Sequence, residues 1–181
     1  MAKNNRVFFV AFVFLLLSCG EEEKQTVKDI DYADIKEDMI DVNRGWTEEE
    51  NQMIENYVRR RNWKMVKTGT GIRYWVYERK DTLSDPANEG DEVFINYQIR
   101  LLEGDSLCYD SEGEPESFIV AMDHVENGLH EVVTYMRKGD KAKVILPYNR
   151  AFGLVGDMDQ IPPQATLVYD MEITEIKKAK K

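Results

Sequence analysis

The fold is indicated most clearly by residues 92–102, with the sequence EVFINYQIRLL. Apolar side chains occupy every second position from Val93 to Leu101, and polar or charged residues fill most positions between them. Successive side chains of a strand point to opposite faces of a sheet, so this alternation predicts a long strand with one buried face. Residues 165–176 alternate in the same way around Tyr169, which predicts a second long strand.

Shorter β-rich runs, separated by glycine, proline and acidic turn residues, surround these two strands. They cover residues 72–78, 107–110, 117–120 and 141–146. Residues 127–136 instead repeat apolar side chains at spacings of three and four, which predicts one short amphipathic helix. A half-open antiparallel sheet that curls around this helix would bury the apolar faces of both, so we expect an α+β fold.

A second helix is predicted on the N-terminal side of the sheet. Thr47 and Glu50 have the spacing of a capping box, and three arginines at residues 59–61 lie where cations favour the helix dipole, although they could alternatively bind an anion. We assign residues 46–67 to this helix and a linker, and the acidic residues 19–45 to a tether. The basic tail at residues 178–181 is expected to be frayed and solvated.

Residues 1–18 have the pattern of a signal peptide. Lys3 and Arg6 precede an apolar run at residues 7–17, which is shorter than the about 20 residues that a membrane-spanning helix needs. The sequence LLSC that ends at Cys19 resembles the bacterial lipobox. This resemblance implies cleavage before the cysteine, its acylation, and a lipid-anchored protein at the cell envelope, outside the cytoplasm. An ordinary secretory peptide with a chance cysteine is the alternative.

Three glutamates at residues 21–23 follow Cys19 almost at once. They resemble the surface-export tether of lipoproteins from some gliding bacteria, and a solvated spacer explains them equally well. An acylated Cys19 cannot form a disulfide. Cys108 would then be a lone thiol, which we expect to be packed rather than reactive.

Composition and motif content exclude several classes of function. The formal net charge of -10 at pH 7 argues against a nucleic-acid partner, because an acidic protein cannot neutralise phosphates, and favours a soluble monomer. The only two histidines, His124 and His130, have no cysteine at metal-ligand spacing, and the sequence contains no glycine-rich phosphate loop and no nucleophile elbow. We therefore expect no metal, no cofactor and no covalent intermediate.

Six phrases resemble, in order, those of FK506-binding-protein-type peptidyl-prolyl cis-trans isomerases. They are GDEVFINY at 90–97, YDS at 109–111, VENGL at 125–129, MRKGDKA at 136–142, the segment from Pro147 to AFG at 151–153, and IPPQATLVY at 161–169. Each phrase alone is weak, but their order makes a strong match. We assign residues 68–177 to one domain that resembles this family.

The resemblance implies a half-barrel of five to six antiparallel strands wrapped on one short helix, with an aromatic pocket between them and an N-terminal helical extension. The residues whose positions imply catalysis are Tyr97, Asp110 and Phe152. Those whose positions imply substrate binding are Tyr109, Phe118, Val125, Glu126, Leu129, Ile161 and Tyr169. In these implied roles Leu129 forms the floor, Asp110 polarises the rotating carbonyl, and the backbone N–H of Glu126 contacts the substrate, so that its side chain matters little.

The residues by themselves also allow a simpler interpretation. Tyr97 and Tyr169 could be ordinary core residues of alternating strands, and Asp110 could be a local cap of its turn. Four positions depart from the family pattern. Phe152 replaces a tyrosine, Glu116 a phenylalanine, Ala121 a glycine and Leu129 a tryptophan. We expect weaker binding of macrolide inhibitors and a low catalytic efficiency.

The expected function is cis–trans isomerisation of X–Pro bonds in proline-containing polypeptides that are exported or belong to the envelope. The combination of lipobox, acidic tether and single domain resembles the gliding-motility-associated lipoprotein isomerases. A non-catalytic module that binds proline peptides or a protein on the envelope is the alternative, favoured by the departures at Phe152 and Glu116. A purely structural envelope protein would leave the pocket phrases without a role.

Overall fold

The computed structural model describes residues 32–80 and 83–180 of the chain. The elements, in chain order, are α1 (Tyr32–Arg61), β1 (Val66–Lys67), β2 (Arg73–Glu78), β3 (Glu92–Leu101), β4 (Leu107–Asp110), β5 (Glu116–Ile119), α2 (Asn127–Val133), β6 (Lys141–Leu146), the 3-10 helix η1 (Tyr148–Arg150) and β7 (Leu167–Lys177). The predicted signal peptide, the lipidation site Cys19 and the glutamates at 21–23 lie outside the described residues.

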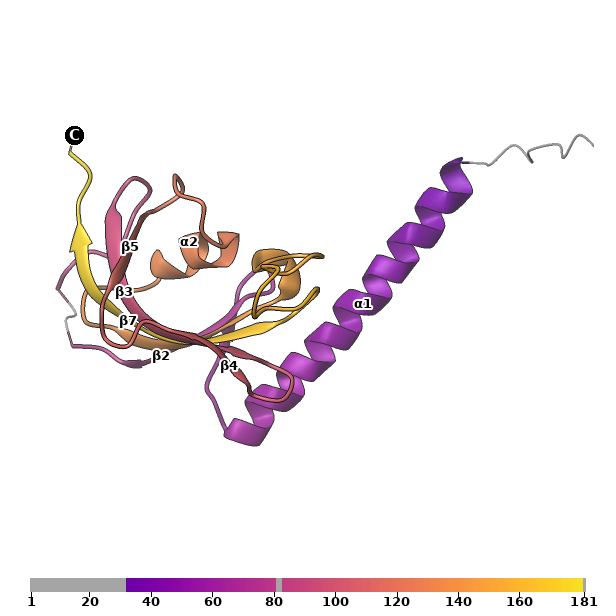
Figure 1. Cartoon of the computed structure of the whole chain (residues 1–181), viewed down its shortest axis with the longest axis horizontal. Helices are drawn as coiled ribbons and strands as arrows, with labels where there is room; N and C mark the ends of the chain where they lie inside the picture. The colour runs from indigo at the N-terminus through magenta and orange to yellow at the C-terminus, as the bar shows by residue number, and fades with distance from the viewer. Residues whose placement is uncertain (1–31, 81–82, 181) are drawn as a thin grey trace, which may run out of the picture. The chain divides into compact units, whose positions relative to one another are not determined.

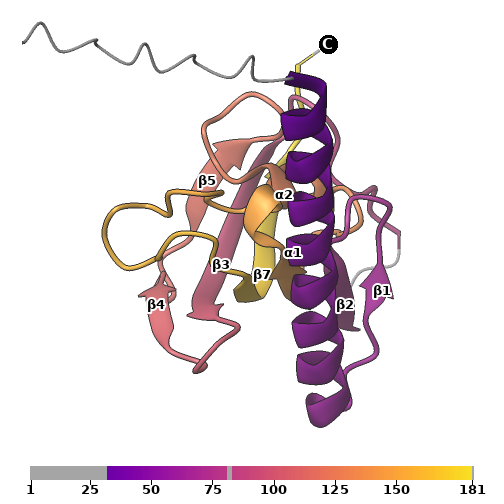
Figure 2. The same cartoon turned by 90° about the vertical axis from the view of Figure 1, so that its right-hand side faces the viewer.

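The strands form one antiparallel sheet that curls around α2 (Figure 1). The order is β1-β2-β6-β7-β3-β4, and β5 pairs with the first half of β3 while β4 pairs with the second half, so both lie along the same edge (Figure 2). The predicted α+β class, the curled antiparallel sheet and its single short helix are confirmed. The described sheet has one strand more than predicted, because β1 is too short to show any periodicity.

The concave face of the sheet and α2 enclose the main core. Val93, Ile95 and Ile99 of β3 lie on this face, as the alternation predicted, together with Leu167, Tyr169, Met171 and Ile173 of β7. From α2, Leu129, Val132 and Val133 pack against them. Gly128 lets this helix approach closely, since a Cβ atom there would lie 2.5 Å from Leu146 Cδ2 and 2.9 Å from the carbonyl oxygen of Arg150.

Helix α1 begins at Tyr32, within the segment assigned to the tether, so the capping box predicted at Thr47 was wrong. Thr47 Oγ1 donates to the carbonyl oxygen of Asn43 at 2.8 Å, which is a bond from position i to i−4 inside a continuing helix. The chain divides after Val42 into two units, and residues 43–61 of α1 belong to the unit that contains the sheet. No helix among the described residues has the length and the apolar content to cross a bilayer.

Residues 43–61 of α1 cover the outer face of the sheet, opposite α2. Ile54 and Tyr57 are buried in a second, smaller core. Their sheet partners are Leu102, Ile145 and Val168. Because Ile145 and Val168 are strand neighbours of concave-face residues, the two cores lie on opposite sides of one sheet.

The C-terminal tail is held, contrary to the expectation that it frays. Lys178 Nζ donates to Asp91 Oδ2 at 3.0 Å and to the carbonyl oxygen of Pro86 at 2.7 Å. The backbone N–H of Ala179 donates to Asp91 Oδ1 at 2.9 Å. Because the Asp91 side chain is buried, its charge needs these partners, and the backbone N–H of Asn88 also donates to Oδ2 at 2.8 Å.

Candidate active site

Most of the predicted pocket residues belong to the core between α2 and the strands β3 and β7, or pack against it. Phe118, Leu129 and Tyr169 expose 4%, 4% and 1% of their surface and form a packed floor. Tyr97 lies beside this floor, and its ring centroid is 6.3 Å from that of Tyr169. Since Tyr97 is partly exposed, it connects the buried floor to the surface.

The loop at residues 147–166 supplies the opposite wall. Ile161 is buried, and Phe152 is partly buried against the same core. Val125 and Tyr109 are also partly buried against the main core, so eight of the ten predicted pocket residues belong to that core or pack against it. The ninth is Glu126, which enters it through its carboxylate.

Three tyrosines of this cluster donate their hydroxyls to carboxylates. Tyr97 Oη lies 2.8 Å from Glu116 Oε1. Tyr169 donates to Glu126 in the same way, and Tyr109 to Asp157. The Glu126 side chain therefore has a structural role that the sequence interpretation did not expect.

These contacts keep the tyrosines protonated. Burial, followed by the Glu116 contact, raises the pKa of Tyr97 above its ordinary value. Burial and the Glu126 charge raise the pKa of Tyr169 well above its ordinary value. The hydrogen bond to Asp157 is the main cause that raises the pKa of Tyr109 to about 12. The cluster thus carries tyrosine hydroxyls that stay neutral and are hydrogen-bonded to acidic side chains.

Asp157 organises the loop from within. Besides Tyr109, its carboxylate accepts the backbone N–H groups of Asp159 at 2.9 Å and Ile161 at 2.8 Å. Burial opposes its ionisation, but these hydrogen bonds outweigh burial and lower the pKa of Asp157. The sequence interpretation missed this residue, although an aspartate beside Gly156 is a usual signal for a side chain that bonds its own loop.

Asp110 is the predicted residue that the structure does not bring to the cluster. It pairs in register with Gln98, whose side chain lies on the outer face of β3 because Tyr97 points to the concave face. Gln98 Nε2 donates to Asp110 Oδ2 at 2.7 Å, and the backbone N–H of Glu112 donates to Oδ1 at 2.8 Å. Asp110 therefore caps its own turn, which is the simpler of the two roles considered for it.

The remaining motif residues have structural roles. His130 Nδ1 accepts the backbone N–H of Ala121 at 3.0 Å, and its ring lies edge-on to Phe118. Cys108 is buried and unbridged, and burial raises the pKa of its thiol, which agrees with a packed rather than a reactive cysteine. Over residues 32–80 and 83–180, no group of His, Cys, Asp and Glu has the geometry of a metal site.

Comparisons with known proteins agree on one family. The model of the FKBP-type peptidyl-prolyl cis-trans isomerase family matches residues 84–174. The isomerase FkpA of Escherichia coli is 36% identical over 120 residues, and the isomerase FPR2 of Saccharomyces cerevisiae is 35% identical over 96 residues. These matches cover 65% of this chain and 43% of FkpA, and 51% of this chain and 70% of FPR2.

The crystal structure of FkpA from Escherichia coli superposes with a TM-score of 0.62 at 29% sequence identity. This superposition covers 78% of the present chain and 65% of the FkpA chain. By sequence, the chain spans less than half of FkpA's length.

Proposed function

This chain belongs to the FKBP-type peptidyl-prolyl cis-trans isomerase family, and from that premise we propose that it accelerates the rotation of X–Pro bonds in polypeptides. The observation that carries the proposal is the aromatic cluster itself. Residues from α2, β3, β7 and the loop at 147–166 pack in one core, and nine of the ten positions implied by the family resemblance lie in it or against it, which supports the proposal.

The chemistry requires binding alone. Amide resonance sets a rotation barrier of about 18–20 kcal/mol, and the uncatalysed step takes tens of seconds. No bond to the protein has to form, so a site needs only to bind the twisted amide more tightly than the planar one. A surface that holds the proline ring and excludes water from the imide carbonyl has this property, because the carbonyl loses partial charge as resonance is lost.

The residues divide this work by position. Leu129 and Phe118 contact the proline ring from below, and Tyr97 and Tyr169 flank it. Val125, Phe152 and Ile161 cover it, with Tyr109 beside the loop. The backbone N–H of Glu126 donates to the substrate main chain. The Asp110 carboxylate bonds Gln98, so a part for it in catalysis stays a prediction.

The aromatic cluster provides a matched test by substitution. Tyr97→Ala removes a ring from the concave face and should lower kcat/KM about tenfold or more, by analogy with the loss of a well-packed contact. Tyr77→Ala removes an equally carboxylate-bonded tyrosine from the outer face, where its hydroxyl lies 2.9 Å from Asp170 Oδ1. The assay follows cis-to-trans relaxation of a proline peptide with the full-length chain. Equal losses of kcat/KM in the two variants would contradict the placement of the site on the concave face.

Binding of proline peptides without turnover is the second candidate, and two observations favour it. Glu116 replaces a phenylalanine and holds the Tyr97 hydroxyl. The floor side chains are closely packed, so a proline has to displace neighbouring groups in order to reach Leu129. Under this alternative, a proline peptide binds the chain while its relaxation rate stays at the uncatalysed value.

The cellular setting that we propose is the cell envelope outside the cytoplasm, facing the periplasm or at the cell surface, with folding of exported or envelope proteins as the task. The pattern of residues 1–18 and the lipobox at Cys19 support it. Metabolic labelling with palmitate tests the anchor. Cys19→Ser should abolish the label and release the protein from membranes, whereas Cys108→Ser, which changes a buried thiol, should leave the label in place. Labelled Cys19→Ser protein would exclude acylation at that cysteine.

A link to gliding motility is the narrowest part of the proposal, and it rests on the three glutamates after Cys19. Replacement of all three by glutamine, with the anchor intact, should remove the protein from the cell surface if they form an export tether. If the variant protein remains on the cell surface, the three glutamates are a solvated spacer, and the proposed link to gliding motility loses its support.

A further inference from the structure

Glu50 is a buried carboxylate on a helix outside the family-matched region. It exposes 7% of its surface and lies on the same side of α1 as Ile54 and Tyr57, which pack on the sheet. One carboxylate oxygen, Oε1, accepts two hydrogen bonds, from the backbone N–H of Tyr148 at 2.8 Å and from Thr166 Oγ1 at 2.5 Å.

These two donors are the ends of the loop that covers the aromatic cluster. Tyr148 begins η1 directly after β6, and Thr166 immediately precedes β7. Phe152 and Ile161, the loop's contributions to the site, lie between them in the chain. A single side-chain atom therefore joins both ends of the loop to one point on α1.

The rest of the loop is fixed from the opposite side. Asp157 holds it to Tyr109 of β4, and the backbone N–H of Gln164 donates to the carbonyl oxygen of Gly153 at 3.0 Å. With both ends and the middle held, Phe152 and Ile161 keep one position over the floor. The pairing of Leu146 with Leu167 also holds the ends of the loop, and loss of the two Glu50 bonds would leave Tyr148 and Thr166 less restrained, so that the residues between them sample more positions.

We propose that Glu50 is a positioning residue for the isomerase site, and that α1 acts through it as a structural part of that site. This inference rests on the proposed function, because the loop matters for catalysis only if the cluster binds proline. It assigns a role to a segment that precedes the match with the family model, which begins at residue 84.

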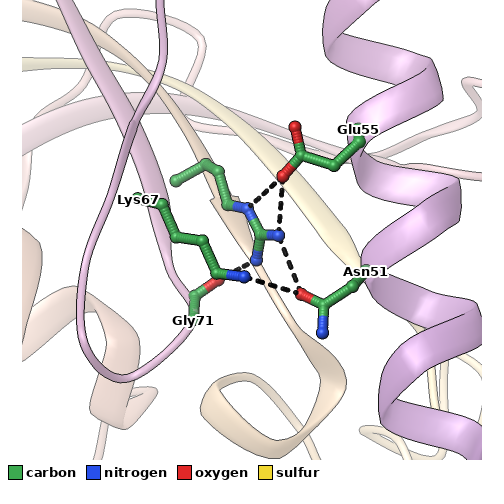
Figure 3. A network of polar contacts seen from close by, with 5 residues as sticks. Asn51, Glu55, Lys67 and Gly71 are labelled. Atoms are coloured by element: carbon green, nitrogen blue, oxygen red, sulfur yellow. Dashed lines mark hydrogen bonds and ion pairs between the residues drawn. The ribbon is translucent and has the colours of Figure 1, made fainter.

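The attachment of α1 to the sheet does not depend on Glu50. Arg73 of β2 is 1% exposed, and its guanidinium donates to Glu55 at 2.8 Å and to Asn51 at 2.8 Å (Figure 3). Lys67 Nζ also donates to Asn51, at 3.4 Å. Together with Ile54 and Tyr57, this network keeps the helix in place when Glu50 changes, so the effect of a substitution should be confined to the loop.

Three substitutions in the full-length chain test the role. Glu50→Gln retains Oε1, which can accept both bonds, and should keep the activity of the unmodified protein. Glu50→Ala removes the oxygen that accepts both bonds and should lower kcat/KM about tenfold, mainly through a higher KM, because a displacement of about 1 Å in a binding group can cost as much as 100-fold. Glu49→Ala, on the exposed side of α1, is the matched control and should change neither constant.

Hydrogen exchange supplies a readout that does not require turnover. In Glu50→Ala, the amides of residues 148–166 should exchange faster while those of β3 and β7 keep their protection. Should this variant fold poorly, Thr166→Val removes one of the two bonds with little change of shape and should give a smaller effect in the same direction.

The outcomes separate this inference from the proposed function. An inactive unmodified protein would contradict isomerisation, yet loop exchange and peptide affinity would still report on Glu50. The inference is overturned if Glu50→Ala matches Glu49→Ala in loop exchange and in peptide affinity, or if Glu50→Gln loses as much as Glu50→Ala.

Discussion

The carboxylates beside the pocket tyrosines carry charge that no described cation balances. On the outer face, acidic side chains such as Asp170 and Glu172 pair with Lys143 and Lys80. Glu116, Glu126 and Asp157 take part in none of the ion pairs formed among residues 32–80 and 83–180. These three acidic side chains lie beside the tyrosines of the cluster, where a bound peptide would meet them.

This charge predicts a preference among substrates. A peptide with lysine before proline should have a kcat/KM about fivefold above that of one with glutamate there, since opposite charges 4 Å apart gain about 1 kcal/mol in water. The ratio should fall in 0.5 M salt, which screens exposed charges. Glu116→Gln should reduce it, and Glu172→Gln on the outer face should not. A ratio indifferent to salt and to Glu116 would contradict this reading of the charges.

Ala121 occupies a backbone conformation that suits glycine. Its φ of 64° is in the left-handed region, which costs a residue with a Cβ about 1–2 kcal/mol. Glycine avoids this cost, but it lowers the stability by about 0.4–1 kcal/mol because the unfolded chain gains conformational entropy. Ala121→Gly should thus raise the free energy of unfolding by about 0.5 kcal/mol, measured by urea titration. A decrease would show that the alanine methyl group makes a favourable contact.

At single residues, the sequence could identify the aromatic members of the site but not all of its polar ones. Tyr97 and Tyr169 follow from strand alternation and from the family phrases. Glu126 was expected to matter through its N–H alone, because no local pattern shows that its carboxylate reaches Tyr169 in a distant strand. A catalytic role for Asp110 stays a prediction: its carboxylate bonds Gln98 in this structure, and the family position names a residue but not the face that its side chain takes.

Among the elements, α2 depends on close approach to β6 and to the loop after it. Gly128→Ala would place a methyl group within 3 Å of Leu146 and of the backbone of Arg150. Overpacking of this kind typically costs about 1–3 kcal/mol. Since α2 carries Leu129, a displaced helix should also lower kcat/KM.

Gly69→Ala is the control for this substitution, because nothing lies within 4 Å of a Cβ atom at that position. Thermal unfolding and the peptide assay on both variants give the comparison. If Gly128→Ala is as stable and as active as Gly69→Ala, the contact between α2 and β6 can accommodate a methyl group without loss of stability.

Strands were easier to predict than helix limits. The alternation of β3 and β7 reflects burial on one face, which is a local property of the sequence. The start of α1 could not be found from Thr47 and Glu50, because a threonine and a glutamate three residues apart can also stand inside a continuing helix, as they do here. The available signal was that Glu50 shares a helix face with Ile54 and Tyr57, where a charged residue needs buried partners.

For the whole molecule, buried acids should set the stability in acid. Burial raises the pKa of Asp91, but three donors outweigh it and lower this pKa: the backbone N–H groups of Ala179 and Asn88 and the Lys178 ammonium. The pKa of Asp157 is also lowered by its hydrogen bonds. A carboxyl whose folded pKa lies below its unfolded value of 3.8 stabilises the fold above that pH, and this contribution is lost as pH falls through the folded pKa.

The free energy of unfolding from urea titrations should therefore hold between pH 7 and about 5 and decline below about 4. Asp91→Asn should be less stable at pH 7 and show a shallower decline. At the alkaline end, Tyr57 and Tyr109 have pKa values raised to about 12, so their contribution is complete below pH 10 and disappears as pH rises through 12. An Asp91→Asn protein with an unchanged acid decline would contradict the role of Asp91.

The proposed aromatic site catalyses rotation about the X–Pro bond and does not merely bind the peptide. Exchange NMR spectroscopy on a proline peptide at equilibrium, with a catalytic amount of the full-length chain, observes both processes at once. We predict cross-peaks between the cis and trans resonances at mixing times below about 1 s, where the free peptide shows none because it interconverts over tens of seconds. Shifted or broadened peptide resonances without such cross-peaks would show binding alone and contradict the claim.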